Sequence, residues 1–88
     1  MKFSMSGNLL RFCQFRQEIE VGGATIQEGM NALVEGCPDL RTVLFDGQGR
    51  LRQAHRLFHN GDMISRDELS RASGPEDEIA ILTAIAGG

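Results

Sequence analysis

The carboxyl-terminal stretch Glu76–Gly88, EDEIAILTAIAGG, decides the fold. Ile79 and Ile81 fall on one face of an extended chain, whereas Ala80, Leu82 and Ala84 fall on the other. This period of two predicts a strand from Glu78 to about Ala84. Two glycines follow, and glycine gives a terminus little structure. The stretch therefore predicts a strand followed by a short, flexible carboxyl-terminal tail.

Two more strands are expected near the amino terminus. Met1–Ser6 alternates apolar and polar residues, and so does Arg16–Val21, whose second face is charged; Gly22 and Gly23 end this strand. The segment between the two strands, LLRFCQF, is apolar without a period. We expect it to form a wide turn that plugs one end of the core.

The clearest helix begins at Thr25, where Thr25 and Glu28 fit the capping box. One stripe of this helix is apolar and consists of Ile26, Met30, Leu33, Val34 and Cys37. Polar residues, including Glu28 and Glu35, take the opposite face. Gly36 and Pro38 are typical of a helix end.

The second half reads as turns and short strands. A single helical turn is expected around Leu40, Val43 and Leu44, and a turn at Asp46–Gly49. Arg50–His59 reads as extended, Asn60-Gly61 as a tight hairpin turn, and Met63-Ile64 as a short return strand. The polar stretch from Ser65 to Asp77 is expected to be irregular.

This order of elements predicts an α+β fold, with a mixed sheet of about five strands and one main helix across it. The first and last strands can lie parallel at the centre, because a crossover that contains the helix separates them. We expect one domain over residues 1–84 and a flexible Gly-Gly tail over residues 85–88.

Composition argues against several function classes. The chain has 88 residues and a net charge of −3, so no basic excess is available to bind the phosphates of a nucleic acid. No apolar run reaches the length of a membrane span, and the MKFSMSGN start does not resemble a signal peptide. We therefore expect a cytoplasmic protein without nucleic-acid or membrane partners.

Cys13 and Cys37 are the only cysteines, and no C-x-x-C spacing or flanking histidine supports a metal site. In a reducing cytosol both are expected to be free thiols. Small apolar fillers and a redox or persulfide role are the two interpretations of these residues. His55 and His59 lie four residues apart on an expected strand, too far to bind one metal together, so satisfied polar positions are expected for both.

The order of elements and the ending resemble the ubiquitin-like β-grasp fold, and more closely the ThiS/MoaD group of sulfur carrier proteins. The residues that carry the resemblance are LFDGQGRLRQAHRLFHNGDMI (Leu44–Ile64) and EDEIAILTAIAGG (Glu76–Gly88). Carriers of the cysteine- and siderophore-linked branch show a similar hairpin and a similar Ala-Gly-Gly ending. This chain differs from them at Thr83, where a proline is common, and at His55 and His59, where small apolar residues are usual.

The resemblance implies that Gly88 is adenylated and converted to a thiocarboxylate that donates sulfur in the biosynthesis of a small molecule. Gly87 and Ala86 would give the clearance that a narrow channel needs. The implied partners are an E1-like adenylating enzyme of the ThiF/MoeB type, a sulfur-accepting biosynthetic enzyme, and a metallopeptidase where residues must be removed to expose the Gly-Gly end. The chain would be a substrate with no catalytic residues, metal or cofactor of its own, and its partner would use ATP.

A docking surface follows from the alternation of the strands. The helix covers one face of the sheet, so Leu57, Ile79 and Ile81 are expected to face it. Phe58, Ala80 and Leu82 are expected to face outward and to bind the partner. Phe58 and Leu82 fall at positions that resemble an isoleucine and a valine of the binding patch of ubiquitin. Burial of Phe58 under a loop is the alternative.

Several functions remain open at this point. Cysteine or thiolated-siderophore synthesis is favoured by the arginine-rich segment before the hairpin. The alternatives are a ubiquitin-like modifier conjugated through Gly88, the small subunit of molybdopterin synthase, and a non-covalent adaptor in which a frayed Gly-Gly end has no role. Lys2, the only lysine, disfavours self-linked chains.

Overall fold

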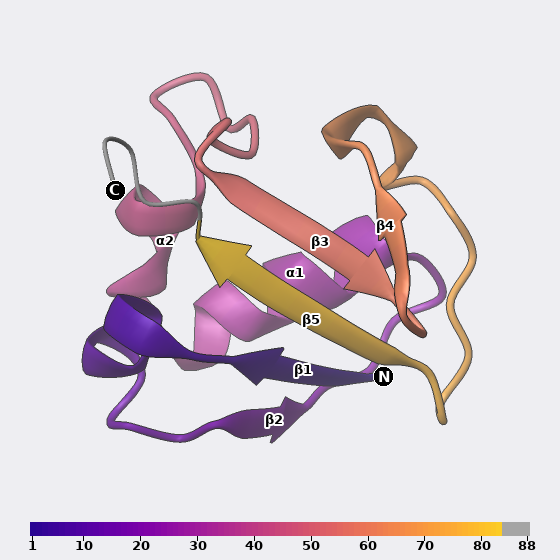
Figure 1. The fold of residues 1–88 in the computed structure, drawn as a ribbon, viewed down its shortest axis with the longest axis horizontal. Coiled ribbons are helices and arrows are strands. Elements are labelled where there is room, and N and C mark those ends of the chain that lie inside the picture. Colours follow the sequence, from indigo (N-terminus) through magenta and orange to yellow (C-terminus); the bar gives the residue numbers. More distant parts are fainter. Residues whose placement is uncertain (84–88) are drawn as a thin grey trace.

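The computed structural model describes residues 1–83, which form one mixed sheet with a helix packed across it (Figure 1). The strands are β1 (Lys2–Met5), β2 (Glu18–Glu20), β3 (His55–His59), β4 (Asp62–Ile64) and β5 (Glu78–Thr83). The helices are α1 (Ile26–Gly36) and α2 (Leu40–Leu44), with short 3₁₀ helices η1 (Gly7–Phe12) and η2 (Arg66–Glu68). Within this described part, no helix is long and apolar enough to cross a membrane.

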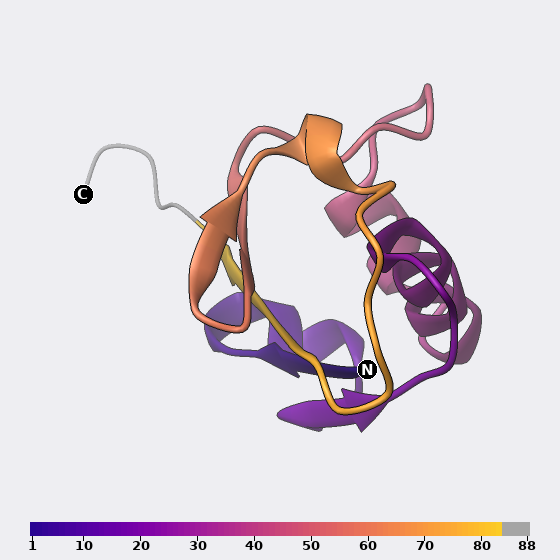
Figure 2. The same cartoon turned by 90° about the vertical axis from the view of Figure 1, so that its right-hand side faces the viewer.

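The sheet has the strand order β2-β1-β5-β3-β4, which confirms the predicted β-grasp arrangement. β1 and β5 pair in parallel at the centre, with Phe3 opposite Ile79, whereas the other pairs are antiparallel. The sheet curves around α1, and the chain after η2 returns past that helix to β5 (Figure 2). Backbone hydrogen bonds from Ile26 and Gln27 to Arg71 and Leu69 fix this return segment against the start of α1.

The predicted cap and apolar stripe of α1 are both confirmed. The Thr25 hydroxyl accepts a hydrogen bond from the Glu28 N–H at 3.2 Å, and the Glu28 carboxylate reaches back to the Ala24 N–H. All members of the stripe are buried. Close packing explains the glycine at position 29, because a Cβ there would collide with the Met1 Sδ and lie 3.1 Å from a ring carbon of Phe3. The glycine thus lets β1 side chains lie directly against the helix.

The expectation of an extended chain over Arg50–His59 is wrong in its first half. Leu51 makes an isolated bridge with Phe45, a turn follows, and β3 starts only at His55. The Asp46 carboxylate explains the turn before it, since it accepts hydrogen bonds from the Gln48 and Arg50 N–H groups and holds the chain back on itself. The side chain of Leu51 is buried in the core, which holds this bridge in place away from the sheet.

The expectation that Cys13 and Cys37 are free thiols is also wrong. They form a disulfide across 24 residues of sequence, with their Cα atoms 5.5 Å apart. The segment after η1 packs against the end of α1, which brings together two cysteines that sequence spacing alone does not pair. The bond therefore ties the predicted plug of the core to the main helix.

The hairpin turn is as predicted, because Asn60 and Gly61 both have positive φ, at 51° and 90°. Beside it, the buried side chain of His59 bonds the Asp77 carboxylate at 2.8 Å. Ser73 Oγ and the Gly74 N–H donate to the same oxygen of Asp77. This polar cluster joins the end of β3 to the return segment. It confirms the expectation that His59 occupies a satisfied polar position.

The Asp77 cluster predicts a loss of stability in acid. Hydrogen bonds from His59 first, and then from the Gly74 N–H and the Asn60 amide, hold the pKa of the Asp77 carboxyl well below its usual range. A carboxylate whose pKa is lower in the folded than in the unfolded protein stabilises the fold. This contribution is complete above the ordinary carboxyl pKa near 4, and it is lost as the pH falls from there toward the lowered pKa of the folded state. Asp77→Asn should therefore be less stable than wild type at pH 7, and the gap should narrow toward pH 2.

Thermal melts of both proteins across that pH range measure the gap. Glu76→Gln is the control, since Glu76 is an exposed neighbour of Asp77. A gap between Asp77→Asn and wild type that stays constant from pH 7 to pH 2 would show that ionised Asp77 does not stabilise the fold.

Candidate functional site

The outer face of the sheet carries the residues predicted to bind a partner. Phe58 lies directly opposite Ala80 in the β3–β5 ladder, and Leu82 follows on the same face of β5. Leu82 is 45% exposed, and Phe58 and Ala80 are half-buried. Leu57, Ile79 and Ile81 are fully buried on the other face. The face assignment from the sequence is therefore confirmed, and Phe58 is not covered by a loop.

These residues surround one shallow hollow on the surface. Phe58, Ala80 and Leu82 form its apolar part, and Ser4, Asn60 and Glu78 form its polar rim. Its volume is about 430 Å³. We call Phe58, Ala80 and Leu82 the outer patch.

Sequence reasoning missed two residues beside the outer patch. Met63 lies opposite Phe58 in the β3–β4 ladder and is 64% exposed. Arg56 lies opposite Leu82 and is also exposed. Met63 could have been predicted from the Asn60-Gly61 turn, because a two-residue hairpin fixes the register of its strands and so places Met63 across from Phe58.

The carboxyl-terminal end of β5 is held by a buried histidine. His55 is 7% exposed, and its Nε2 donates to the Val43 carbonyl at 2.7 Å, since a carbonyl oxygen can only accept. Its Nδ1 lies 3.1 Å from Thr83 Oγ1, from which it accepts when the ring is neutral. This contact fixes Thr83, the last described residue, to α2 and β3. With both ring nitrogens bonded, His55 occupies a satisfied polar position, as expected from the sequence.

The predicted reactive residues, Gly88, Gly87 and Ala86, lie outside the described residues, and so does the expected boundary between domain and tail at Ala84. Over residues 1–83, no three or more His, Cys, Asp or Glu side chains are grouped so that they could hold a metal ion. The candidate site within residues 1–83 is therefore a stretch of exposed surface. It consists of the outer patch and the anchored strand end next to it.

No protein-family model matches this chain. Among curated proteins, it is 30% identical to small archaeal modifier protein 1 of Haloferax volcanii over 67 residues, which are 76% of this chain and 74% of that protein. The crystal structure of the same Haloferax protein superposes with a TM-score of 0.83 and 26% identity, over 99% of this chain and 97% of the other.

Two further solved structures share the fold. CysO in the BexX/CysO complex of Amycolatopsis orientalis matches with a TM-score of 0.84 and 21% identity, over 99% of this chain and 98% of that one. CysO of Mycobacterium tuberculosis matches with a TM-score of 0.82 and 19% identity, over 96% and 98%. The sequence relative and the shared topology together show that this chain belongs to the ThiS/MoaD-like family of ubiquitin-like β-grasp proteins.

Proposed function

We propose that this protein carries sulfur as a thiocarboxylate on Gly88 and donates it in the biosynthesis of a small molecule. One observation carries the proposal: the central strand β5 joins the outer patch to an anchored end at Thr83, five residues before Gly88. An enzyme that binds Phe58 and Leu82 is thereby positioned to receive the residues that follow. Cysteine or a thiolated siderophore is the favoured product, because of the arginine-rich segment before the hairpin.

The chemistry needs an activating partner, because a carboxylate resists attack by a nucleophile. An E1-like enzyme would join the Gly88 carboxylate to the α-phosphate of ATP and release pyrophosphate. Sulfide would then attack the acyl carbon, the C–O bond to AMP would break, AMP would leave, and a thiocarboxylate would remain. A persulfide would instead give an acyl disulfide, whose S–S bond a second thiol must cleave, forming a disulfide with the donor sulfur, to release the thiocarboxylate. Gly88 supplies the acyl carbon whether it is the encoded terminus or is exposed by a metallopeptidase. The carrier itself contributes its binding surface and its terminus, and acts as a substrate.

The small residues before Gly88 suit this chemistry. Water would hydrolyse the acyl adenylate, so the activating site must exclude it. A narrow channel excludes water but also excludes side chains, and Gly87 and Ala86 present almost none. From Thr83, an extended chain reaches Gly88 over about 17 Å at roughly 3.3 Å per residue. That length is enough to cross from a docked surface into a closed pocket.

Protein modification through Gly88 is the second candidate, and the relative named as a small archaeal modifier protein favours it. The same adenylate would serve, with a lysine amine of a target protein as the acceptor. Lys2 is a poor acceptor within this chain, since the nearby carboxylates of Glu18 and Glu78 raise its pKa and keep the amine protonated. Self-linked chains are therefore disfavoured, whereas single conjugation to other proteins is not.

Intact mass spectrometry tests the two candidates. The protein is incubated with ATP, sulfide and a ThiF/MoeB-type adenylating enzyme encoded near it. A carrier should exchange one terminal oxygen for sulfur, and only when ATP is present. A modifier should give higher-mass conjugates in a lysate of its own organism. Absence of both products would contradict any role for Gly88.

Docking through the outer patch gives a further prediction. Phe58→Asp and Leu82→Asp should each raise the KM of the adenylating enzyme for the carrier at least about tenfold, which corresponds to about 1.4 kcal/mol of binding free energy. Burying an aspartate against an apolar partner surface costs its hydration, while on the free carrier it stays in water. ATP–pyrophosphate exchange measures the effect.

Phe15→Asp is the matched control for these variants, because Phe15 is 70% exposed and lies in the loop before β2 rather than on the outer patch. Its KM should be unchanged. Thermal melts should show all three variants folded. Normal KM values for both patch variants would exclude the outer patch as the docking surface.

A further inference from the structure

The geometry points to a second binding site, a cationic pocket at the β3–β4 edge, which we propose takes a glutamate side chain from an acidic segment of the activating enzyme. This inference rests on the proposed function, because it assigns a second contact to the same partner. The pocket is separate from the hollow of the outer patch, and sequence reasoning did not anticipate it.

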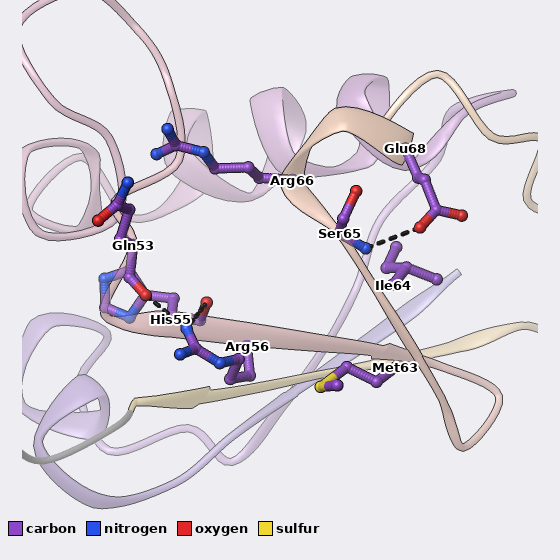
Figure 3. A pocket seen from close by; sticks show the side chains of 8 residues that line it. All are labelled: Gln53, His55, Arg56, Met63, Ile64, Ser65, Arg66 and Glu68. Carbon is purple, nitrogen blue, oxygen red and sulfur yellow. Dashed lines mark hydrogen bonds between the residues drawn. The ribbon is translucent and has the colours of Figure 1, made fainter.

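The pocket exists because β4 is short. Pairing between β3 and β4 starts at the hairpin and stops at Leu57 opposite Ile64, so the first residues of β3 have no β4 neighbour. The chain then turns away into η2 and leaves a cavity of about 550 Å³. Its walls include Gln53 and Arg56 on one side and Met63, Ile64 and Arg66 on the other (Figure 3).

The two arginines of the pocket have no carboxylate partner among the described residues. Arg56 is held by the backbone carbonyls of Gln53 and His55, and Arg66 donates to the Leu51 carbonyl at 2.9 Å. Carbonyls fix each guanidinium without cancelling its charge. Because a guanidinium has five N–H donors, each arginine keeps donors for a ligand. The cations are thus held in place before any ligand arrives.

The only acidic side chain in the described walls does not neutralise them. Glu68 Oε1 accepts a hydrogen bond from the Ser65 N–H at 2.9 Å, which caps η2 (Figure 3). The other oxygen of Glu68 pairs with Arg71 at 3.5 Å. Both oxygens therefore already have partners, and neither partner is Arg56 or Arg66. The pocket keeps an unmatched positive charge in a chain whose net charge is −3.

The shape of the walls favours a glutamate over a bare inorganic anion. Met63 and Ile64 line the cavity with apolar surface, which a phosphate cannot use but the methylenes of a glutamate can cover. The arginine fork binds a carboxylate in two-point contact. Arg56 is also the cross-strand neighbour of Leu82, so a partner seated on the outer patch extends directly over the pocket.

Charge variants test the pocket through KM. With a ThiF/MoeB-type enzyme that activates the wild-type protein, Arg56→Glu and Arg66→Gln should each raise the carrier's KM about tenfold in ATP–pyrophosphate exchange, while kcat changes little. The dependence of KM on salt should weaken in both variants, because one ion pair is lost. Arg11→Glu, an exposed arginine on η1, is the control and should behave as wild type.

A titration without the enzyme tests the pocket independently. In NMR spectra, the acetylated peptide Glu-Leu-Glu should shift the side-chain N–H signals of Arg56 and Arg66 at millimolar concentration, and the Arg66→Gln variant should not respond at Arg56. Inorganic phosphate at the same concentration should have a smaller effect. An equal response to phosphate would overturn the assignment of a glutamate ligand.

The outcomes separate the two proposals. If wild type is activated but the variants keep its KM, the pocket proposal is wrong and the carrier function stands. If no adenylating enzyme accepts the wild type, the carrier function fails, and with it the assignment of the partner, whatever the peptide titration shows. Thermal melts confirm that each variant is folded before either result is used.

Discussion

Deletion of Gly88 should abolish thiocarboxylate formation and leave the thermal unfolding midpoint unchanged. The shortened chain ends at Gly87, whose carboxylate falls one residue, roughly 3.3 Å, short of the position that the adenylating site holds for attack. Reactivity depends steeply on such placement. The fold should not respond, because the deletion leaves in place every core residue and strand pair described for residues 1–83. Intact mass after reaction with ATP and sulfide gives the first result, and a thermal melt gives the second.

Two matched changes sharpen this prediction. Gly87→Val keeps the length of the arm but adds a β-branched side chain beside the reactive carbonyl, so activation should slow sharply. One residue added after Gly88 should block activation until a peptidase removes it. If the deletion variant still accepts sulfur, or if the sulfur maps to Cys13 or Cys37, the thiocarboxylate mechanism is wrong. The second outcome would also require the disulfide between these cysteines to open.

Replacement of Leu33 by alanine should lower the free energy of unfolding by about 2–5 kcal/mol. Leu33 is 1% exposed and lies in the middle of the apolar stripe of α1, against the sheet. The loss combines the transfer free energy of the removed methyl groups with the cost of the cavity that they leave. Since small domains are stabilised by about 5–15 kcal/mol in all, this one change should remove a large part of the stability.

Glu35→Ala is the control on the same helix. Glu35 is exposed, and a surface substitution of this kind should change the free energy of unfolding by less than about 0.5 kcal/mol. Urea unfolding of both variants gives the comparison. Equal losses for the two would contradict the packing of α1 against the sheet.

Local patterns in the sequence were sufficient for the fold. The alternation in Glu78–Thr83 predicted both the strand and its buried face, because side chains of a strand alternate regardless of what the strand pairs with. The same holds for the stripe and cap of α1, whose spacing and capping residues act within a few positions. The Asn60-Gly61 turn follows from the backbone preferences of its own residues. Each of these features depends on near neighbours in the chain.

Only the tertiary structure decided which distant side chains meet. It pairs Cys13 with Cys37, places His55 on Thr83, and brings His59 to Asp77. It also delays the start of β3 to His55 and places Arg56 and Arg66 in the wall of one pocket beyond the end of β4. Hydrogen bonds and ion pairs act over a few ångströms in space, whereas these partners are separated by 10 to 28 residues of sequence, so no local pattern records them.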